Sequence, residues 1–120
     1  KTMGDAVMAV FRRPAAAVRA LLAAQRELAT APRPHLLKVG IHEGPCIAVS
    51  LNERQDYFGQ TVNIASRVQH LATSREIFAT SSVLDNPLAA ELMTTRGLTP
   101  QSHHVALRGI TDAMDIFAIP

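Results

Sequence analysis

Short apolar runs alternate with helical patterns along this chain, and this alternation constrains the fold more than any other feature. The run "AVMAVF" follows the turn-like "TMGD" and predicts a mostly buried strand over residues 6–11. Apolar residues then recur at helical spacing through "AAAVRALLAAQRELA", beside Pro14, a residue that favours the first turn of a helix. A strand followed by such a helix indicates a sheet covered by helices.

The rest of the chain continues this alternation. Two prolines in "TAPRP" break the chain, and "HLLKVGIHEGPCIAVSL" contains two extended runs joined at "EGP" by a hairpin or a bend. We expect a second helix in "YFGQTVNIASRVQHLA", a short strand in "REIFAT", helical pieces in "SSVLDNPLAAELMTTR", and closing strands in "HHVALRG" and "MDIFAIP". The expected fold class is α+β, with helices on one face of a mainly antiparallel sheet.

Composition narrows the class of protein. The 120 residues are 48% apolar, which suits one domain with its own core. The net charge of +2 is scattered and there are only one Tyr and four Phe, which argues against nucleic-acid binding. The single Cys46 forms no internal disulfide and fits a reducing, cytoplasmic setting. No apolar run is long enough for a membrane segment, and a start at Lys1 suggests part of a longer protein.

The second expected helix carries a polar stripe. Gln60, Asn63, Arg67 and His70 fall on one side of it at 100° per residue. Asn63 and Arg67 are four residues apart and therefore point the same way. A guanidinium gives several planar donors to phosphate oxygens, and an amide can orient a sugar, so this stripe suits a polyanionic ligand. A solvated helix face is the alternative interpretation.

Other polar residues have structural and functional interpretations. Asp5 follows Gly4, so it is either a turn former or a ligand at the start of a strand. We interpret His42 as a packed strand histidine and the His103–His104 pair as a strand edge, in preference to metal sites. Cys46 is interpreted as a small core residue rather than a nucleophile.

The order of four segments resembles one known family. "KTMGDAVMAVF", "KVGIHEGP", "DYFGQTVNIASRVQ" and "LRGITDAMDIFAI" together resemble the catalytic domain of class III nucleotidyl cyclases, the adenylate and guanylate cyclases. The resemblance implies a ferredoxin-like cyclase-homology fold. It runs nearly end to end, but the family's domain begins earlier, with a strand and helix that carry its first metal-binding aspartate. The resemblance thus implies that residues 1–120 are the C-terminal two-thirds of the domain.

The resemblance also implies roles for five residues. Asp5 matches the second of two aspartates that hold two Mg²⁺ or Mn²⁺ ions on the nucleotide triphosphate. Asn63 matches the residue that positions the ribose, and Arg67 the one that stabilises charge at the α-phosphate. Lys1 and Asp56 match the residues that read the purine, in the donor and acceptor pattern of adenine. An exposed terminal lysine is the alternative for Lys1.

Two positions depart from the family pattern. Pro45 and Ile110 stand where members often have an arginine and a lysine on the β- and γ-phosphates, and Arg108 is a candidate replacement. The implied function is conversion of ATP to cyclic AMP and pyrophosphate by a head-to-tail homodimer whose sites lie between two copies. We expect the 120-residue chain alone to be inactive, because it has one of the family's metal aspartates.

Two other functions are weighed against the cyclase. The first is a catalytically degenerate cyclase-homology module that dimerises or senses nucleotide to regulate attached domains. The second is an RNA-binding sheet of similar topology, which the shortage of aromatic residues disfavours.

Overall fold

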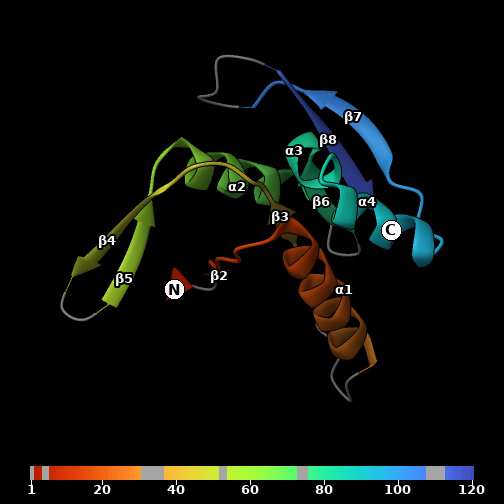
Figure 1. The fold of residues 1–120 in the computed structure, drawn as a ribbon, viewed down its shortest axis with the longest axis horizontal. Helices are drawn as coiled ribbons and strands as arrows, with labels where there is room; N and C mark the ends of the chain where they lie inside the picture. Colours follow the sequence, from red (N-terminus) through yellow and green to blue (C-terminus); the bar gives the residue numbers. More distant parts are fainter. Residues whose placement is uncertain (1, 4–5, 31–36, 52–53, 73–75, 108–112) are drawn as a thin grey trace.

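The computed structural model describes residues 2–3, 6–30, 37–51, 54–72, 76–107 and 113–120 (Figure 1). The helices are α1 (Pro14–Thr30), α2 (Gln60–Leu71), α3 (Ser81–Leu84) and α4 (Pro87–Thr95). The strands are β1 (Thr2–Met3), β2 (Ala6–Val7), β3 (Val39–Ile41), β4 (Ile47–Leu51), β5 (Arg54–Phe58), β6 (Ile77–Thr80), β7 (Gln101–Val105) and β8 (Met114–Ile119). No helix in these ranges is both long and apolar enough to cross a membrane.

A four-stranded sheet in the order β3-β6-β8-β7 forms the centre of the fold. Strands β3 and β6 are parallel, with Val39 opposite Ile77, whereas β6 pairs antiparallel with β8, and β8 with β7. The sheet is therefore mainly antiparallel, and the predicted α+β class is confirmed. Because β7 lies at the edge, the expectation that His103 and His104 sit on a strand edge is also confirmed.

Helices cover both faces of this sheet, so the expectation of helices on one face was wrong. Neighbouring residues of β3 point to opposite sides: Val39 and Ile41 join the core with α1, whereas Gly40 lies against α2. Successive strand side chains alternate between faces, and the short apolar strands of this chain can therefore serve two layers at once.

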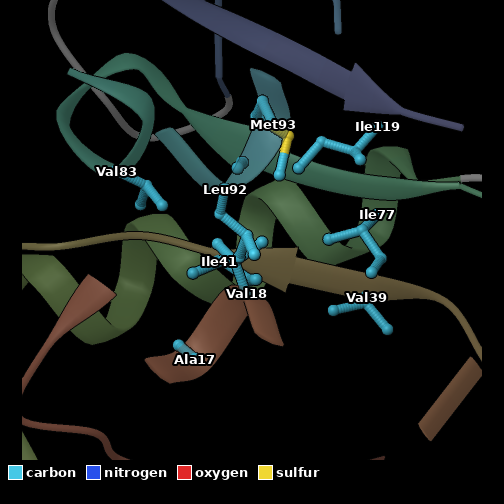
Figure 2. Packing of buried hydrophobic residues seen from close by; sticks show 10 residues of the cluster. Ala17, Val18, Val39, Ile41, Ile77, Val83, Leu92, Met93 and Ile119 are labelled. Carbon is cyan, nitrogen blue, oxygen red and sulfur yellow. The ribbon is translucent and has the colours of Figure 1, made fainter. Parts of the chain in front are cut away.

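The larger core lies between the sheet and the helices α1, α3 and α4. Val18, Ile41 and Leu92 point toward one another at its centre (Figure 2). Its buried members are Ala17, Val18, Val39, Ile41, Ile77, Ala79, Val83, Leu92, Met93 and Ile119. A smaller core forms on the other face, where Val68 of α2 packs with Leu107 and Ile116. Burial of these apolar side chains supplies the main driving force for the two-sided arrangement.

The beginning of the chain differs from its predicted buried strand. Strand β2 ends at Val7, and β1 and β2 pair only with each other among the described strands. Val7, Val10 and Phe11 are 75%, 50% and 40% exposed. An apolar run becomes buried only where a neighbouring strand or helix covers it, and the described residues supply no such cover.

A two-stranded antiparallel ribbon, β4 and β5, extends away from the four-stranded sheet (Figure 1). Strand β4 belongs to this ribbon and β3 to the sheet, so the "EGP" segment makes a bend between two sheets and not a hairpin. Strand β5 was not predicted, and it takes Tyr57 and Phe58 from the start of the expected helix. Its polar residues lack an apolar alternation, and cross-strand hydrogen bonds with β4 define it instead.

Candidate functional site

Helix α2 docks on β3 and on residues 43–46, which precede β4 and which we call the connector. Gly40 provides the first contact: a Cβ atom there would lie 2.7 Å from the Gln69 Cα and 2.9 Å from the Ala65 carbonyl oxygen. Gly44 provides the second, since its Cβ would lie 2.6 Å from the Thr61 hydroxyl oxygen. The α2 backbone therefore approaches β3 at Gly40 more closely than a side chain there would allow, and the Thr61 side chain packs against the connector at Gly44.

Two hydrogen bonds fix the ends of this docked helix. The Thr61 hydroxyl in the first turn donates to the Pro45 carbonyl, and the Gln69 side-chain amide near the last turn donates to the Lys38 carbonyl at 3.4 Å. Between these anchors Val68 is completely buried. The helix is thus held at both ends and along its apolar side, and its outward side is free to carry functional groups.

Asn63 and Arg67 lie on this outward side, one helical turn apart. Asn63 is exposed and Arg67 is half-buried, while Gln60 and His70 on the same stripe are exposed. The predicted polar stripe is therefore confirmed as a surface feature of α2. Leu71 in the last turn of α2 is also exposed, at 43%.

Asp56 is placed on the strand that leads into α2. It lies on β5 opposite Val49, it is half-buried, and one carboxylate oxygen accepts a hydrogen bond of 2.8 Å from the Tyr57 backbone amide. Gly59 then turns the chain into the helix with a φ of 127°, a conformation that residues with side chains rarely adopt. Asp56, Asn63 and Arg67 therefore belong to one continuous β5–α2 segment.

Two other predicted site residues, Lys1 and Asp5, lie outside the described residues, as do Arg108 and Ile110. Strands β1 and β2 pair with Met3 opposite Ala6, and Gly4 and Asp5 stand between them in the sequence. The roles of Lys1 and Asp5 therefore stay predictions of the sequence.

The residues around the connector were not predicted to act together. His42 follows β3, and its Nδ1 lies 2.6 Å from the hydroxyl of Thr80, which is completely buried. Burial lowers the pKa of His42 below its usual 6.5, because desolvation disfavours the charged imidazolium. Cys46 at the end of the connector is exposed, so its interpretation as a core residue was wrong. Only the parallel pairing of β3 with β6 brings His42 to Thr80, and the sequence held no signal for it.

The family follows from comparison of the whole chain with known proteins. The family model of the adenylate and guanylate cyclase catalytic domain matches residues 1–115. The chain belongs to this family. No curated protein sequence matches this cyclase domain.

Solved structures of cyclases share its fold. An adenylate cyclase from Trypanosoma brucei, solved in its monomeric state, has 22% identity and a TM-score of 0.83, covering 99% of this chain and 68% of that one. The RhGC guanylate cyclase domain from Catenaria anguillulae, solved with GTP, has 20% identity and a TM-score of 0.76, covering 100% and 70%. An adenylate/guanylate cyclase/hydrolase from Silicibacter pomeroyi has 23% identity and a TM-score of 0.68, covering 99% and 69%. The cyclase-homology fold is thereby confirmed, with relatives of both nucleotide types.

Class III cyclases generally use divalent metal ions, so the donor set of this cyclase domain matters. Within the described ranges, no group of three or more His, Cys, Asp or Glu side chains could hold a metal ion. His104 instead pairs with Asp115 at 2.7 Å on the exposed surface, and the His103 ring stacks on Phe78. Asp5 remains the family-matched carboxylate, and metal binding by this cyclase domain is therefore a proposal that depends on it.

Proposed function

We propose that this cyclase domain converts ATP to cyclic AMP and pyrophosphate in cyclic-nucleotide signalling. One observation carries the proposal: Asn63 and Arg67 lie one turn apart on the outward side of a helix that is anchored at both ends. A rigid helix can hold an amide and a guanidinium in a fixed geometry toward one ligand, which is what positioning and charge stabilisation in phosphoryl transfer require.

The proposed reaction is an intramolecular displacement. The ribose 3′-hydroxyl releases its proton to solvent and its oxygen bonds to the α-phosphorus. The bond from that phosphorus to the bridging oxygen breaks, and pyrophosphate leaves with that oxygen. Asn63 holds the ribose oxygen in line for attack. Arg67 donates hydrogen bonds to the α-phosphate oxygens, where negative charge builds up in the transition state.

Asp5 is proposed as the metal ligand of this site. Two bound Mg²⁺ or Mn²⁺ ions would neutralise triphosphate charge and lower the pKa of the 3′-hydroxyl.

A half-buried arginine such as Arg67 is compatible with a site of this kind, because guanidinium groups keep their charge when partly removed from water.

Lys1 and Asp56 are proposed to read the base. A lysine donates to a ring nitrogen of adenine, and an aspartate accepts from its exocyclic amine, whereas guanine presents roughly the opposite pattern. Asp56 is half-buried, which raises the cost of leaving its carboxylate mispaired and so favours discrimination.

We also propose that two copies assemble head to tail, as cyclase domains work as dimers. Asp5 of one copy and Asp56, Asn63 and Arg67 of the other then form each site.

A second candidate is a degenerate cyclase-homology module that binds nucleotide or dimerises without turnover. One observation favours it: Pro45 stands where members often carry a phosphate-binding arginine, and its carbonyl is engaged by Thr61.

A single assay distinguishes the two candidate functions. The protein encoded by the complete gene is incubated with ATP or GTP, with Mg²⁺ and then with Mn²⁺, and cyclic nucleotide is quantified alongside nucleotide binding. Cyclic AMP formation supports the enzyme. Nucleotide binding with no cyclic product under either metal contradicts the enzyme and supports the module.

A further inference from the structure

A chain of side-chain hydrogen bonds connects His42 to the connector. The His42 Nδ1 lies 2.6 Å from the Thr80 hydroxyl, which lies 3.1 Å from the Ser82 hydroxyl. The Ser82 hydroxyl in turn donates to the Glu43 carbonyl at 3.2 Å. This hydrogen-bond chain begins after the end of β3, passes through the junction of β6 and α3, and returns to the residue after His42.

The number of protons available on these groups decides which one donates and which one accepts in each hydrogen bond. The Glu43 carbonyl only accepts, so the single hydroxyl proton of Ser82 is used on it. Thr80 must therefore donate its own single proton to Ser82. The Thr80 oxygen is then left as an acceptor for His42, whose Nδ1 must carry a proton. The neutral imidazole is thus fixed as the Nδ1–H tautomer.

The hydrogen-bond chain ends at the Glu43 carbonyl, next to the helix that carries Asn63 and Arg67. Ser82 holds the Glu43 carbonyl, and two residues later the Pro45 carbonyl accepts from Thr61 in the first turn of α2. Gly44, between these two points, is in close contact with the Thr61 side chain. A displacement of the connector would therefore move the turn in which Asn63 lies.

We propose that His42 is a positioning residue of the cyclase site: its Nδ1–H starts a one-directional chain through Thr80 and Ser82 that fixes the connector, and thereby the first turn of α2. This inference rests on the proposed function, because it assigns His42 an effect on the Asn63 geometry. Thr80 is completely buried, and a buried hydroxyl that loses its hydrogen-bond partners destabilises the folded protein. Its hydrogen bonds to His42 and Ser82 are therefore maintained.

The tautomer is tested directly. Two-bond ¹H–¹⁵N correlation spectra of the ¹⁵N-labelled protein at pH 7.5 distinguish Nδ1–H from Nε2–H imidazole. We expect the Nδ1–H pattern for His42. An Nε2–H pattern would overturn the proposal, and this readout requires no enzymatic activity.

Three variants test the positioning effect in the protein encoded by the complete gene. In His42→Asn the amide nitrogen lies near the former Nδ1, so we expect kcat within about threefold of wild type. In His42→Gln the amide is displaced, and in Ser82→Ala the chain is cut while His42 is intact. For both we expect kcat to fall roughly ten- to a hundredfold with KM unchanged. Ser81→Ala is the matched control, because no hydrogen bond of the Ser81 hydroxyl occurs among the described residues.

The backbone amide resonance of Asn63 provides a second readout. We expect it to shift in Ser82→Ala and to stay in place in Ser81→Ala. Equal kcat for His42→Asn and His42→Gln, or an unshifted Asn63 amide in Ser82→Ala, contradicts the positioning role. If the wild-type protein turns over no nucleotide, the proposed function fails, while the tautomer and the Asn63 shift still decide whether the chain fixes α2.

Discussion

Gly40 of β3 and Gln69 of α2 meet with no side chain between them: a Cβ atom at position 40 would lie 2.7 Å from the Gln69 Cα. The atoms on the helix side of this contact belong to the backbone, so they cannot move aside as a flexible side chain could. This contact sets how closely the helix carrying Asn63 and Arg67 lies to the sheet.

Gly40→Ala is therefore expected to destabilise the protein and to displace α2. Overpacking of this kind typically costs about 1–3 kcal/mol of unfolding free energy. Urea denaturation measures this loss, and cyclic AMP formation is expected to fall with it because α2 shifts. Gly97→Asn is the control, since Gly97 has a φ of 66°, which asparagine tolerates, and a Cβ atom added there would have no neighbour within 4 Å. A Gly40→Ala protein as stable as wild type would show that the contact is looser than described.

Asn63→Ala and Arg67→Ala are each expected to lower turnover by about a hundredfold with ATP affinity nearly unchanged. The reason is that both groups act mainly on the transition state. Steady-state kinetics with a separate nucleotide-binding measurement checks this. His70→Ala on the same exposed stripe is the matched control and should retain turnover. A loss of affinity alone would instead assign Asn63 and Arg67 to ground-state binding.

ATP is expected to be preferred over GTP by about a hundredfold, because guanine would leave the half-buried carboxylate of Asp56 without a matching donor. Turnover of both nucleotides at equal concentration measures the preference. Asp56→Asn should reduce it, since an amide can also donate where the carboxylate only accepts. Equal rates for ATP and GTP in the wild-type protein would exclude Asp56 as an adenine reader.

Stability is expected to fall as the pH drops below about 6.5, the usual pKa of histidine. Burial lowers the pKa of folded His42, so the unfolded chain takes up a proton at a pH where the folded protein does not. Unfolding is therefore favoured by acidification, until the pH reaches the lowered folded pKa. Melting temperatures between pH 7.5 and 5.5 measure the effect, with His42→Asn as the comparison. An identical pH dependence in that variant would rule out His42 as its source.

The sequence alone predicted those elements whose own periodicity or punctuation defines them. Pro14 and the recurring apolar residues predicted α1, and the polar stripe with Asn63 and Arg67 predicted the outward side of α2. The family was also accessible from the sequence, because its motifs are local and ordered along the chain.

Only the tertiary structure decided which surfaces are covered. The run ending in Val10 and Phe11 has the apolarity of a buried strand, but burial depends on a neighbour from elsewhere in the chain, and the described residues provide none. Strand β5 exists because β4 pairs with it, and helices occupy both faces because alternate residues of β3 face opposite layers. The same holds for His42: the parallel pairing of β3 with β6 sets it beside Thr80, 38 residues away, and such long-range contacts leave no trace in local patterns.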